Sequence, residues 1–164
     1  MYTSGNIYSA SFSATALTTN PYDVFGLLAP TNSRVVVREI KIGQYSDAGD
    51  AQAEMLSVVL LRGSTASSTA GTAVTPVNRK GHTGATSAGS SVLTCSTALA
   101  STASAVQIEA DAFNVASGYR HYPVPSERLV LEKSQRLHVR ITAPNDALTV
   151  NGTITFEEVG QIPV

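Results

Sequence analysis

The most regular pattern in this sequence is an alternation of apolar and polar residues near its C-terminal end. Over residues 148–156 every second residue is apolar or glycine, and this set consists of Leu148, Val150, Gly152, Ile154 and Phe156. A period of two is typical of a strand that buries one face. The segment is therefore predicted to be a β-strand with these five residues on its inner side.

A second segment with the same period comes shortly before it, where Arg136, His138 and Arg140 alternate with Leu137, Val139 and Ile141. Residues 143–146 read Ala-Pro-Asn-Asp, a composition typical of turns. We therefore predict that the two segments form an antiparallel hairpin.

Shorter alternations and β-branched runs extend over most of the remaining chain. They predict strands at residues 8–16, 23–29, 33–45, 56–62, 91–97, 105–110, 112–116, 119–125 and 128–132. The run at 56–62 is apolar enough for burial on both faces, and the proline-bounded segment 119–125 suits a sheet edge. Residues 46–54 are predicted to form a loop or one helical turn beginning at Ser46 or Asp47.

No window of the sequence shows helical periodicity, and about eight to ten strands separated by turn signals favour an all-β fold. We predict an antiparallel β-sandwich of jelly-roll type with long Ser/Thr/Ala/Gly-rich loops. A closed up-and-down barrel is the alternative. The predicted core consists of Phe12, Ile40, Ile42, Val58, Leu60, Leu137, Val139, Ile141, Val150, Ile154 and Phe156.

Composition changes this picture in one region, between Gly63 and Ser104. Of these 42 residues, 31 are Ser, Thr, Ala or Gly, and only Arg79 and Lys80 are charged. So few apolar side chains do little to offset the ~1–2 kcal/mol of backbone entropy lost per ordered residue. We therefore predict a single domain over residues 1–164, from which residues 63–104 extend as long loops or as an arm lying across a neighbouring subunit.

The low charge of the chain indicates which classes of binding partner to expect. The formal net charge is −1, and 14% of residues are charged, against the ~25% typical of soluble domains. We expect neither nucleic acid nor a membrane as a partner. The low charge favours burial of surface in an assembly, and a polar uncharged surface of Ser and Thr is the weaker interpretation. The N-terminus lacks the pattern of a signal peptide, so we expect synthesis in a cytoplasm.

Candidate metal ligands are poorly placed in the sequence. Three acids lie close together at positions 47, 50 and 54, without the spacing of a calcium-binding loop. The three histidines, His82, His121 and His138, are scattered along the chain. We expect no metal site.

Other chemical motifs are also missing. Residues 81–84 read Gly-His-Thr-Gly, without the lysine and helix of a phosphate-binding loop. Cys95 is the single cysteine and is expected to be inert. Asn151-Gly152-Thr153 matches a glycosylation acceptor, but it lies within a predicted strand. We expect no catalytic or cofactor-binding residues, and therefore no enzyme.

Four arginines allow two interpretations. Arg136 and Arg140 share one face of a predicted strand, and Arg34 and Arg38 lie on another. They could form a carboxylate-binding patch at a protein interface, where arginine is enriched. The alternative is a solvated polar face with ordinary salt bridges.

Three segments of the sequence resemble those of a known group of proteins. They are Ile-Gly-Gln-Tyr-Ser-Asp-Ala-Gly-Asp-Ala-Gln-Ala-Glu at 42–54, Asp-Ala-Phe-Asn-Val at 111–115, and residues 148–160, which end in Phe-Glu-Glu-Val-Gly. They resemble small structural proteins of tailed bacteriophages, over residues 22–160 and least in 63–104. None of these segments is a chemical motif, so the resemblance transfers no catalytic or binding residue.

The resemblance implies a capsid decoration, or cement, protein. Such a protein is expected to bind the major capsid protein on the outer surface of the virion, commonly as a homotrimer, after synthesis in the host bacterial cytoplasm. The alternative is a jelly-roll module at the tail or a vertex that binds carbohydrate or a receptor. The aromatic cluster that would serve it is Tyr119, Arg120, His121 and Tyr122.

Overall fold

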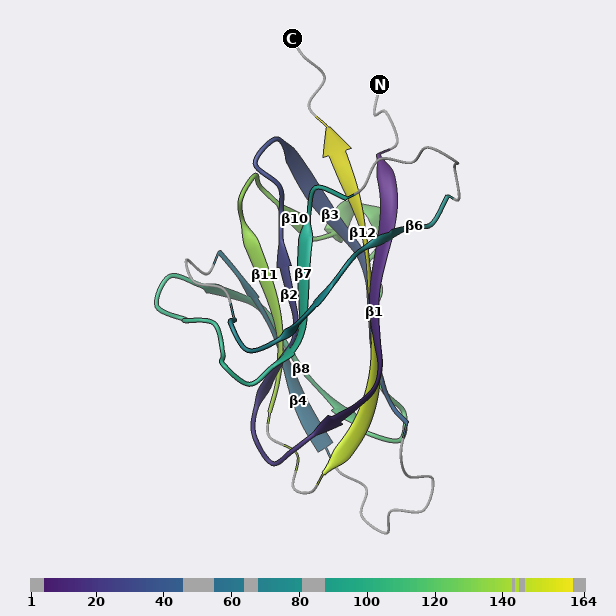
Figure 1. Ribbon diagram of the computed structural model, residues 1–164, viewed down its shortest axis with the longest axis vertical. Helices are drawn as coiled ribbons and strands as arrows, with labels where there is room; N and C mark the ends of the chain where they lie inside the picture. The colour runs from purple at the N-terminus through teal and green to yellow at the C-terminus, as the bar shows by residue number, and fades with distance from the viewer. Residues whose placement is uncertain are drawn as a thin grey trace.

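The computed structural model describes residues 5–45, 55–63, 68–80, 88–142, 144 and 147–160, and its strands form two antiparallel sheets that enclose the core (Figure 1). Sheet A has the order β10-β3-β12-β1-β6, with β9 also paired to β3. Its strands are β1 (Asn6–Leu17), β3 (Ser33–Gln44), β6 (Val77–Asn78), β9 (Tyr119–His121), β10 (Val130–Leu131) and β12 (Leu148–Gly160).

Sheet B has the order β5-β7-β2-β11-β4-β8. Its strands are β2 (Tyr22–Leu28), β4 (Met55–Arg62), β5 (Thr72–Val74), β7 (Ser91–Ser96), β8 (Val106–Asn114) and β11 (Arg136–Ile141). The one helical element among the described residues is the short 3-10 turn η1 (Pro125–Glu127), which lies between β9 and β10. No helix in these ranges has the length and apolarity needed to cross a membrane.

The strand pairing is that of a jelly roll. The first main strands pair with the last ones in reverse order: β1 with β12, β2 with β11, β3 with β9 and β10, and β4 with β8. This long antiparallel ribbon is rolled up, so that β12 also pairs with β3 and β11 with β4. Two facing sheets built in this way form a jelly-roll sandwich. The predicted fold class is therefore confirmed over the barrel alternative.

The core lies between the two sheets, and all eleven predicted core residues are buried in it. Aromatic rings meet at two places, with centroid distances of 5.9 Å for Tyr8 and Phe156 and 5.3 Å for Phe12 and Phe25. Gly152 lies opposite Phe12 on the neighbouring strand. A Cβ atom at Gly152 would lie only 2.4 Å from Cε1 of Phe12, so the packing of this ring requires glycine there.

The predicted hairpin of residues 136–156 is wrong. β11 lies in sheet B between β2 and β4, whereas β12 lies in sheet A between β1 and β3. An alternating pattern identifies the buried face of a strand and does not identify its neighbours. Both strands point their apolar faces at the same core, from opposite sheets, and the connection between them crosses from one sheet to the other.

β1 contains an irregularity that the alternating pattern did not reveal. Its register with β12 shifts between Phe12 and Thr15, and Ala14 adopts a positive φ of 49°. The backbone N–H of Ala14 donates to Oδ1 of Asn151 over 2.7 Å. Because a bulge moves the following residues to the other face, Ala14 is exposed and Leu17 is buried.

Several other strands differ in extent from the prediction. The segments 105–110 and 112–116 form the single strand β8, and the segments 119–125 and 128–132 shrink to the short strands β9 and β10. β4 buries mainly one face, with Leu61 as the buried residue of the other.

The described part of the Ser/Thr/Ala/Gly-rich tract is built into the sandwich. β7 pairs with β2, β5 pairs with β7, and β6 pairs with β1, so that residues 72–78 cross from sheet B to sheet A (Figure 1). Residues 72–74, 77–78 and 91–96 are therefore strands of the two sheets, which corrects the prediction of loops or an arm at these positions, whereas residues 97–104 form a loop. Main-chain ladders and hydroxyl bonds hold the tract, for example from Ala70 N–H to Ser96 Oγ at 3.3 Å. Small side chains allow this close approach without much apolar burial.

Some predictions fall outside the described residues. They concern the loop or helical turn at 46–54 with its three acids, the 81–84 segment with His82, and most of the turn at 143–146.

Candidate functional site

Arg140, one of the candidate interface arginines, binds a carboxylate of its own chain. Its Nε donates to Oδ1 of Asp23 over 2.7 Å, and its Nη2 donates to Oδ2 of Asp23 over 3.2 Å and to the carbonyl of Ala100 over 2.8 Å. Asp23 is fully buried, and its Oδ2 also accepts the N–H of Ala100. Arg140 therefore ties the tract at Ala100 onto sheet B, and the carboxylate-binding patch does not form there.

His138 lies beside this ion pair on the outer face of β11 and is 1% exposed. Its Nδ1 is 3.7 Å from Oδ2 of Asp23, and neither ring nitrogen has a hydrogen-bond partner among the described residues. Burial lowers the pKa of His138 below its usual 6.5; the Asp23 carboxylate opposes this shift, and the guanidinium groups of Arg140 and Arg136 add to it. The imidazole is therefore neutral at pH 7.

Arg34 and Arg38 lie on the outer face of the other sheet. Arg34 forms an exposed ion pair with Glu132, with 2.7 Å between Nε and Oε2. Arg38 lines a groove of about 340 Å3 whose walls are Ile7, Arg38, Glu39, Arg79, Lys80, Tyr122, Arg128 and Thr155. The floor comes from β1, β3 and β12, while residues after β6 and residues around η1 form the two sides. We call this feature the basic groove.

Two carboxylates near the basic groove are fully engaged. Glu157 accepts from Nη2 of Arg38 over 2.6 Å and from the backbone N–H of Gly5 over 2.7 Å. Oε1 of Glu39 lies 2.8 Å from Nε of Arg120 and 3.2 Å from Nζ of Lys41. Three cations therefore share two acids here.

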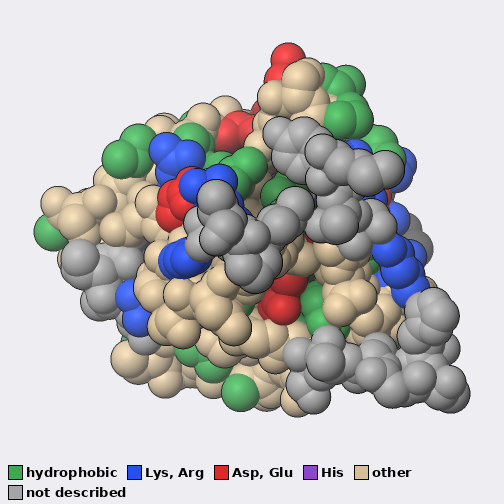
Figure 2. Space-filling model, turned by 90° about the horizontal axis from the view of Figure 1, so that it is seen from above, with side chains coloured by type: hydrophobic (Ala, Val, Ile, Leu, Met, Phe, Trp, Pro, Cys, Tyr) green, Lys and Arg blue, Asp and Glu red, His purple; other side chains and the backbone are tan. Residues whose placement is uncertain are grey.

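Three further cations of the groove have no carboxylate partner in the described part of the chain. Arg79 donates to the neutral hydroxyl of Thr155 over 3.2 Å, and Nζ of Lys80 to the carbonyl of Gly5 over 3.4 Å. Arg128 has a buried Nε without a hydrogen-bond partner. The chain carries a net charge of −1, so this positive surface is a local feature. Figure 2, a view from above, likewise shows Lys and Arg side chains in separate groups within a largely uncharged surface.

This arrangement suits the binding of anions through a protein interface. Guanidinium groups form paired hydrogen bonds to carboxylates. Tyr122, on the rim, is 63% exposed, and Cζ of Arg120 lies 5.1 Å from its ring centroid. Tyrosine and arginine are the residue types that dominate binding energy at protein interfaces. The groove can therefore accept carboxylate groups through its guanidinium side chains.

The predicted aromatic cluster at 119–122 is split by the structure. Tyr119 is buried, and its hydroxyl donates to Oε1 of Glu109 over 3.1 Å. Burial and the Glu109 carboxylate raise the pKa of Tyr119 above its ordinary value. Nδ1 of His121 lies 3.0 Å from the same carboxylate. Only Tyr122 of the two tyrosines is exposed to a partner.

The described residues contain no group of three or more His, Cys, Asp or Glu that could hold a metal ion. Burial raises the pKa of the Cys95 thiol to about 11, so that the reactive thiolate is scarce at pH 7.

Sequence reasoning missed Arg79, Lys80 and Arg128 as parts of a common surface. The adjacent pair Arg79 and Lys80, isolated in an otherwise uncharged tract, was the available signal. Nothing local connected it to Arg128 or Arg38, because only the pairing of β6 with β1 brings the tract to sheet A.

No protein-family model and no curated protein matches the sequence. Among solved structures, VP17, a capsid protein of bacteriophage P23-77, aligns over 99% of this chain and 100% of its own, with 8% identity and a TM-score of 0.24. A chain from the structure of infectious bursal disease virus, Gx strain, aligns over 98% of this chain and 40% of its own, with 10% identity and a TM-score of 0.19. The structure of the T13 particle of the same virus aligns over 99% of this chain and 41% of its own, with 12% identity and a TM-score of 0.18. Such scores do not define a common fold, so the fold assignment rests on the strand order.

Proposed function

We propose that this protein is a structural virion protein of a tailed bacteriophage, and within that class a capsid decoration protein. It binds the major capsid protein on the outer surface of the shell and bridges neighbouring subunits, as a homotrimer and without any catalytic step. The basic groove is the observation that carries the proposal, because it offers three cations that have no carboxylate partner among the described residues, beside an exposed tyrosine.

A decoration protein needs contact area and many copies rather than chemistry. A standard stable protein interface buries about 1,600 Å². Binding to the assembled shell but not to its dissociated subunits stabilises the shell by mass action. In this proposal an acidic segment of the capsid protein lies in the basic groove, and the jelly roll serves as a rigid scaffold for it.

The copy number in purified virions tests the proposed function. We expect hundreds of copies per particle, measured by quantitative mass spectrometry against the major capsid protein, and we expect empty capsids to carry the protein too. A handful of copies, located at the tail or at a vertex, would favour the binding module for carbohydrate or a receptor. Absence from both particles would reject a virion role altogether.

The role of the basic groove is tested separately with charge-neutral variants. The double variant Arg79→Gln/Arg128→Gln is expected to weaken binding to capsids at least tenfold and to reduce its dependence on salt concentration. Arg34→Gln is the matched control, because Arg34 is already paired with Glu132. Unchanged capsid binding by the double variant would reject the groove as the contact surface while leaving the virion role intact.

A further inference from the structure

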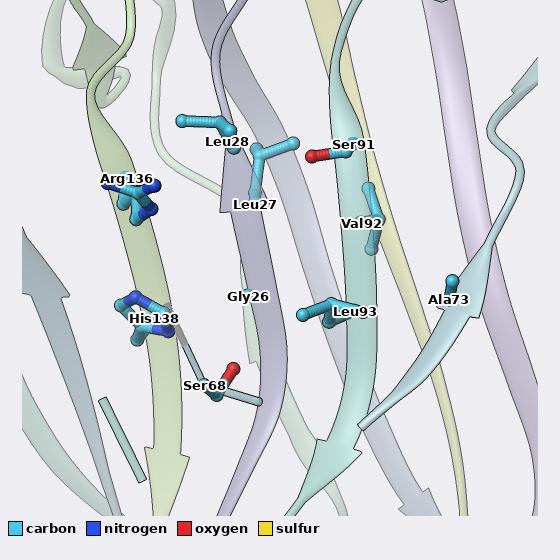
Figure 3. Close-up of a pocket in the computed structure, with 10 residues that line it drawn as sticks. All are labelled: Gly26, Leu27, Leu28, Ser68, Ala73, Ser91, Val92, Leu93, Arg136 and His138. Carbon is cyan, nitrogen blue, oxygen red and sulfur yellow. The ribbon is translucent and has the colours of Figure 1, made fainter. Parts of the chain in front are cut away.

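A second cavity, which the capsid proposal does not use, lies on the outer face of sheet B (Figure 3). Its volume is about 200 Å3. Strands β2, β7 and β11 supply most of its lining, and Ala73 of β5 closes one side. Leu28 and Leu93 make much of this lining apolar, whereas Ser68 and His138 bring polar atoms to it.

The polar end of the cavity contains hydrogen-bonding atoms that are left unpaired. Ser68 and His138 are each 1% exposed. Oγ of Ser68 and both ring nitrogens of His138 have no hydrogen-bond partner among the described residues. The two side chains converge over Gly26, because a Cβ atom built there would lie 3.0 Å from Ser68 Oγ and 3.3 Å from His138 Nδ1. Figure 3 shows Ser68 between the strands that carry His138 and Gly26.

Buried hydrogen-bonding groups in folded proteins nearly always have partners, so this pair specifies the chemistry of a ligand. A neutral imidazole offers one donor and one acceptor, and a serine hydroxyl can act as either. A ligand hydroxyl, which also donates and accepts, can pair with Ser68 Oγ and with His138 Nδ1 at the same time. A charged ligand group fits less well. The Asp23 carboxylate, 3.7 Å from His138 Nδ1, disfavours an anion at this end, and the Arg136 guanidinium, which also lines the cavity, disfavours a cation.

The apolar part of the lining indicates what the rest of the ligand must be. A flat ring can lie against Leu28 and Leu93, with its hydroxyl directed toward Gly26. Because Gly26 has no side chain, Ser68 Oγ and His138 Nδ1 can both lie close to the strand, within 3.3 Å of where a Cβ atom would be, and they mark the end of the cavity that the hydroxyl would reach. One aromatic ring with one hydroxyl suits a cavity of about 200 Å3.

We propose that this cavity binds a phenolic group, with its hydroxyl between Ser68 and His138 and its ring against Leu28 and Leu93. Two sources have this chemistry: a free phenolic molecule, and a tyrosine side chain of a bound polypeptide. The proposal goes beyond the capsid role and does not depend on it.

A matched pair of probes tests the site. p-Cresol and toluene have the same shape except for the hydroxyl, and binding of each is followed by NMR through the ring signals of His138. We expect p-cresol to bind about tenfold more tightly than toluene and to shift the His138 nitrogen signals, because only p-cresol pairs the buried atoms. Equal binding of the two probes, no binding of either, or tighter binding of benzoate than of p-cresol would overturn the proposal.

Two variants test whether Ser68 binds the hydroxyl of the ligand. A peptide-like probe tests whether the phenolic group belongs to a polypeptide or to a free small molecule. Ser68→Ala should reduce the preference for p-cresol over toluene severalfold and leave toluene binding unchanged, whereas Ser13→Ala, an exposed serine in β1, should change neither. A preference that survives Ser68→Ala would contradict the assignment. N-acetyl-tyrosine amide binding at least as tightly as p-cresol indicates a polypeptide source, and p-cresol binding alone indicates a free small molecule.

Discussion

At the scale of single residues, Gly152 is where the core has no room for a side chain. A Cβ atom there would lie 2.4 Å from Cε1 of Phe12 and 3.0 Å from Cζ of Phe25. Gly152→Ala is therefore expected to destabilise the fold by about 1–3 kcal/mol, the usual cost of overpacking. Urea denaturation measures this as a lower midpoint. Gly43→Ala, on the adjacent strand with nothing within 4 Å of an added Cβ, is the control and should change stability little.

The buried ion pair of Asp23 and Arg140 is a second position with large expected effects. Asp23→Ala leaves the Arg140 guanidinium in a mostly buried site without its carboxylate. Removing one partner of a buried pair typically costs about 3–5 kcal/mol. Glu132→Ala breaks the exposed pair with Arg34 and should cost no more than about 1 kcal/mol. Similar thermal midpoints for the two variants would contradict this account of the Asp23 site.

His138 makes stability depend on pH. The pKa of its imidazole is lowered in the folded protein and is about 6.5 in the unfolded chain. Between these two values the unfolded chain binds more protons, so stability is fully present above about pH 6.5 and declines as pH falls through the window below it. Denaturation at several pH values should show this decline, and His138→Gln should make it shallower. An unchanged slope in the variant would show that other groups cause it.

At the scale of elements, β7 shows how a tract of small residues joins a sheet. Its backbone pairs with β2 on one side and with β5 on the other, so its main-chain bonds are those of an interior strand. We expect amide hydrogen exchange of β7 to be protected to a similar degree as that of β11, and the short strands β5 and β6 to exchange faster. Exchange of β7 as fast as that of an exposed loop would restore the arm hypothesis.

The strand β8 forms one edge of sheet B, and no described strand pairs with its outer side. Val106 and Ile108 are exposed on it, yet it also carries Glu109, Asp111 and a register shift against β4. Charges and bulges at an edge discourage the addition of a further strand. We therefore expect contacts with partners on sheet A, where the basic groove lies, rather than at this edge.

At the scale of the whole molecule, exposed apolar residues continue the surface next to the basic groove. Tyr122, Val124 and Val130 are all exposed around η1. Burial of this surface between copies would support the proposed homotrimer. Sedimentation equilibrium at tens of micromolar should give three times the 17.1 kDa chain mass, and Val124→Asp should shift the mass towards that of one chain. A monomer that stays soluble over this concentration range would count against the trimer.

Local patterns along the chain were sufficient to predict eleven residues of the core. Residues such as Ile154 and Val139 are buried because alternation along an extended backbone places every second side chain on the same face, and that relation is local. The same local rule predicted the main strands and, with them, the all-β class. It failed at Ala14, where a bulge that depends on Asn151 of another strand changes the face.

The neighbours of each strand, and the contacts between polar residues far apart in the chain, are visible only in the three-dimensional structure. β11 and β12 follow each other in the chain but lie in different sheets, because the rolled ribbon pairs each with a strand far away in sequence. Asp23 meets Arg140 through the pairing of β2 with β11, and Ser68 approaches His138 because the tract that carries Ser68 lies against sheet B. The basic groove likewise joins Arg38, Arg79 and Arg128 from three separate segments. Such contacts depend on long-range strand pairing, which no local pattern encodes.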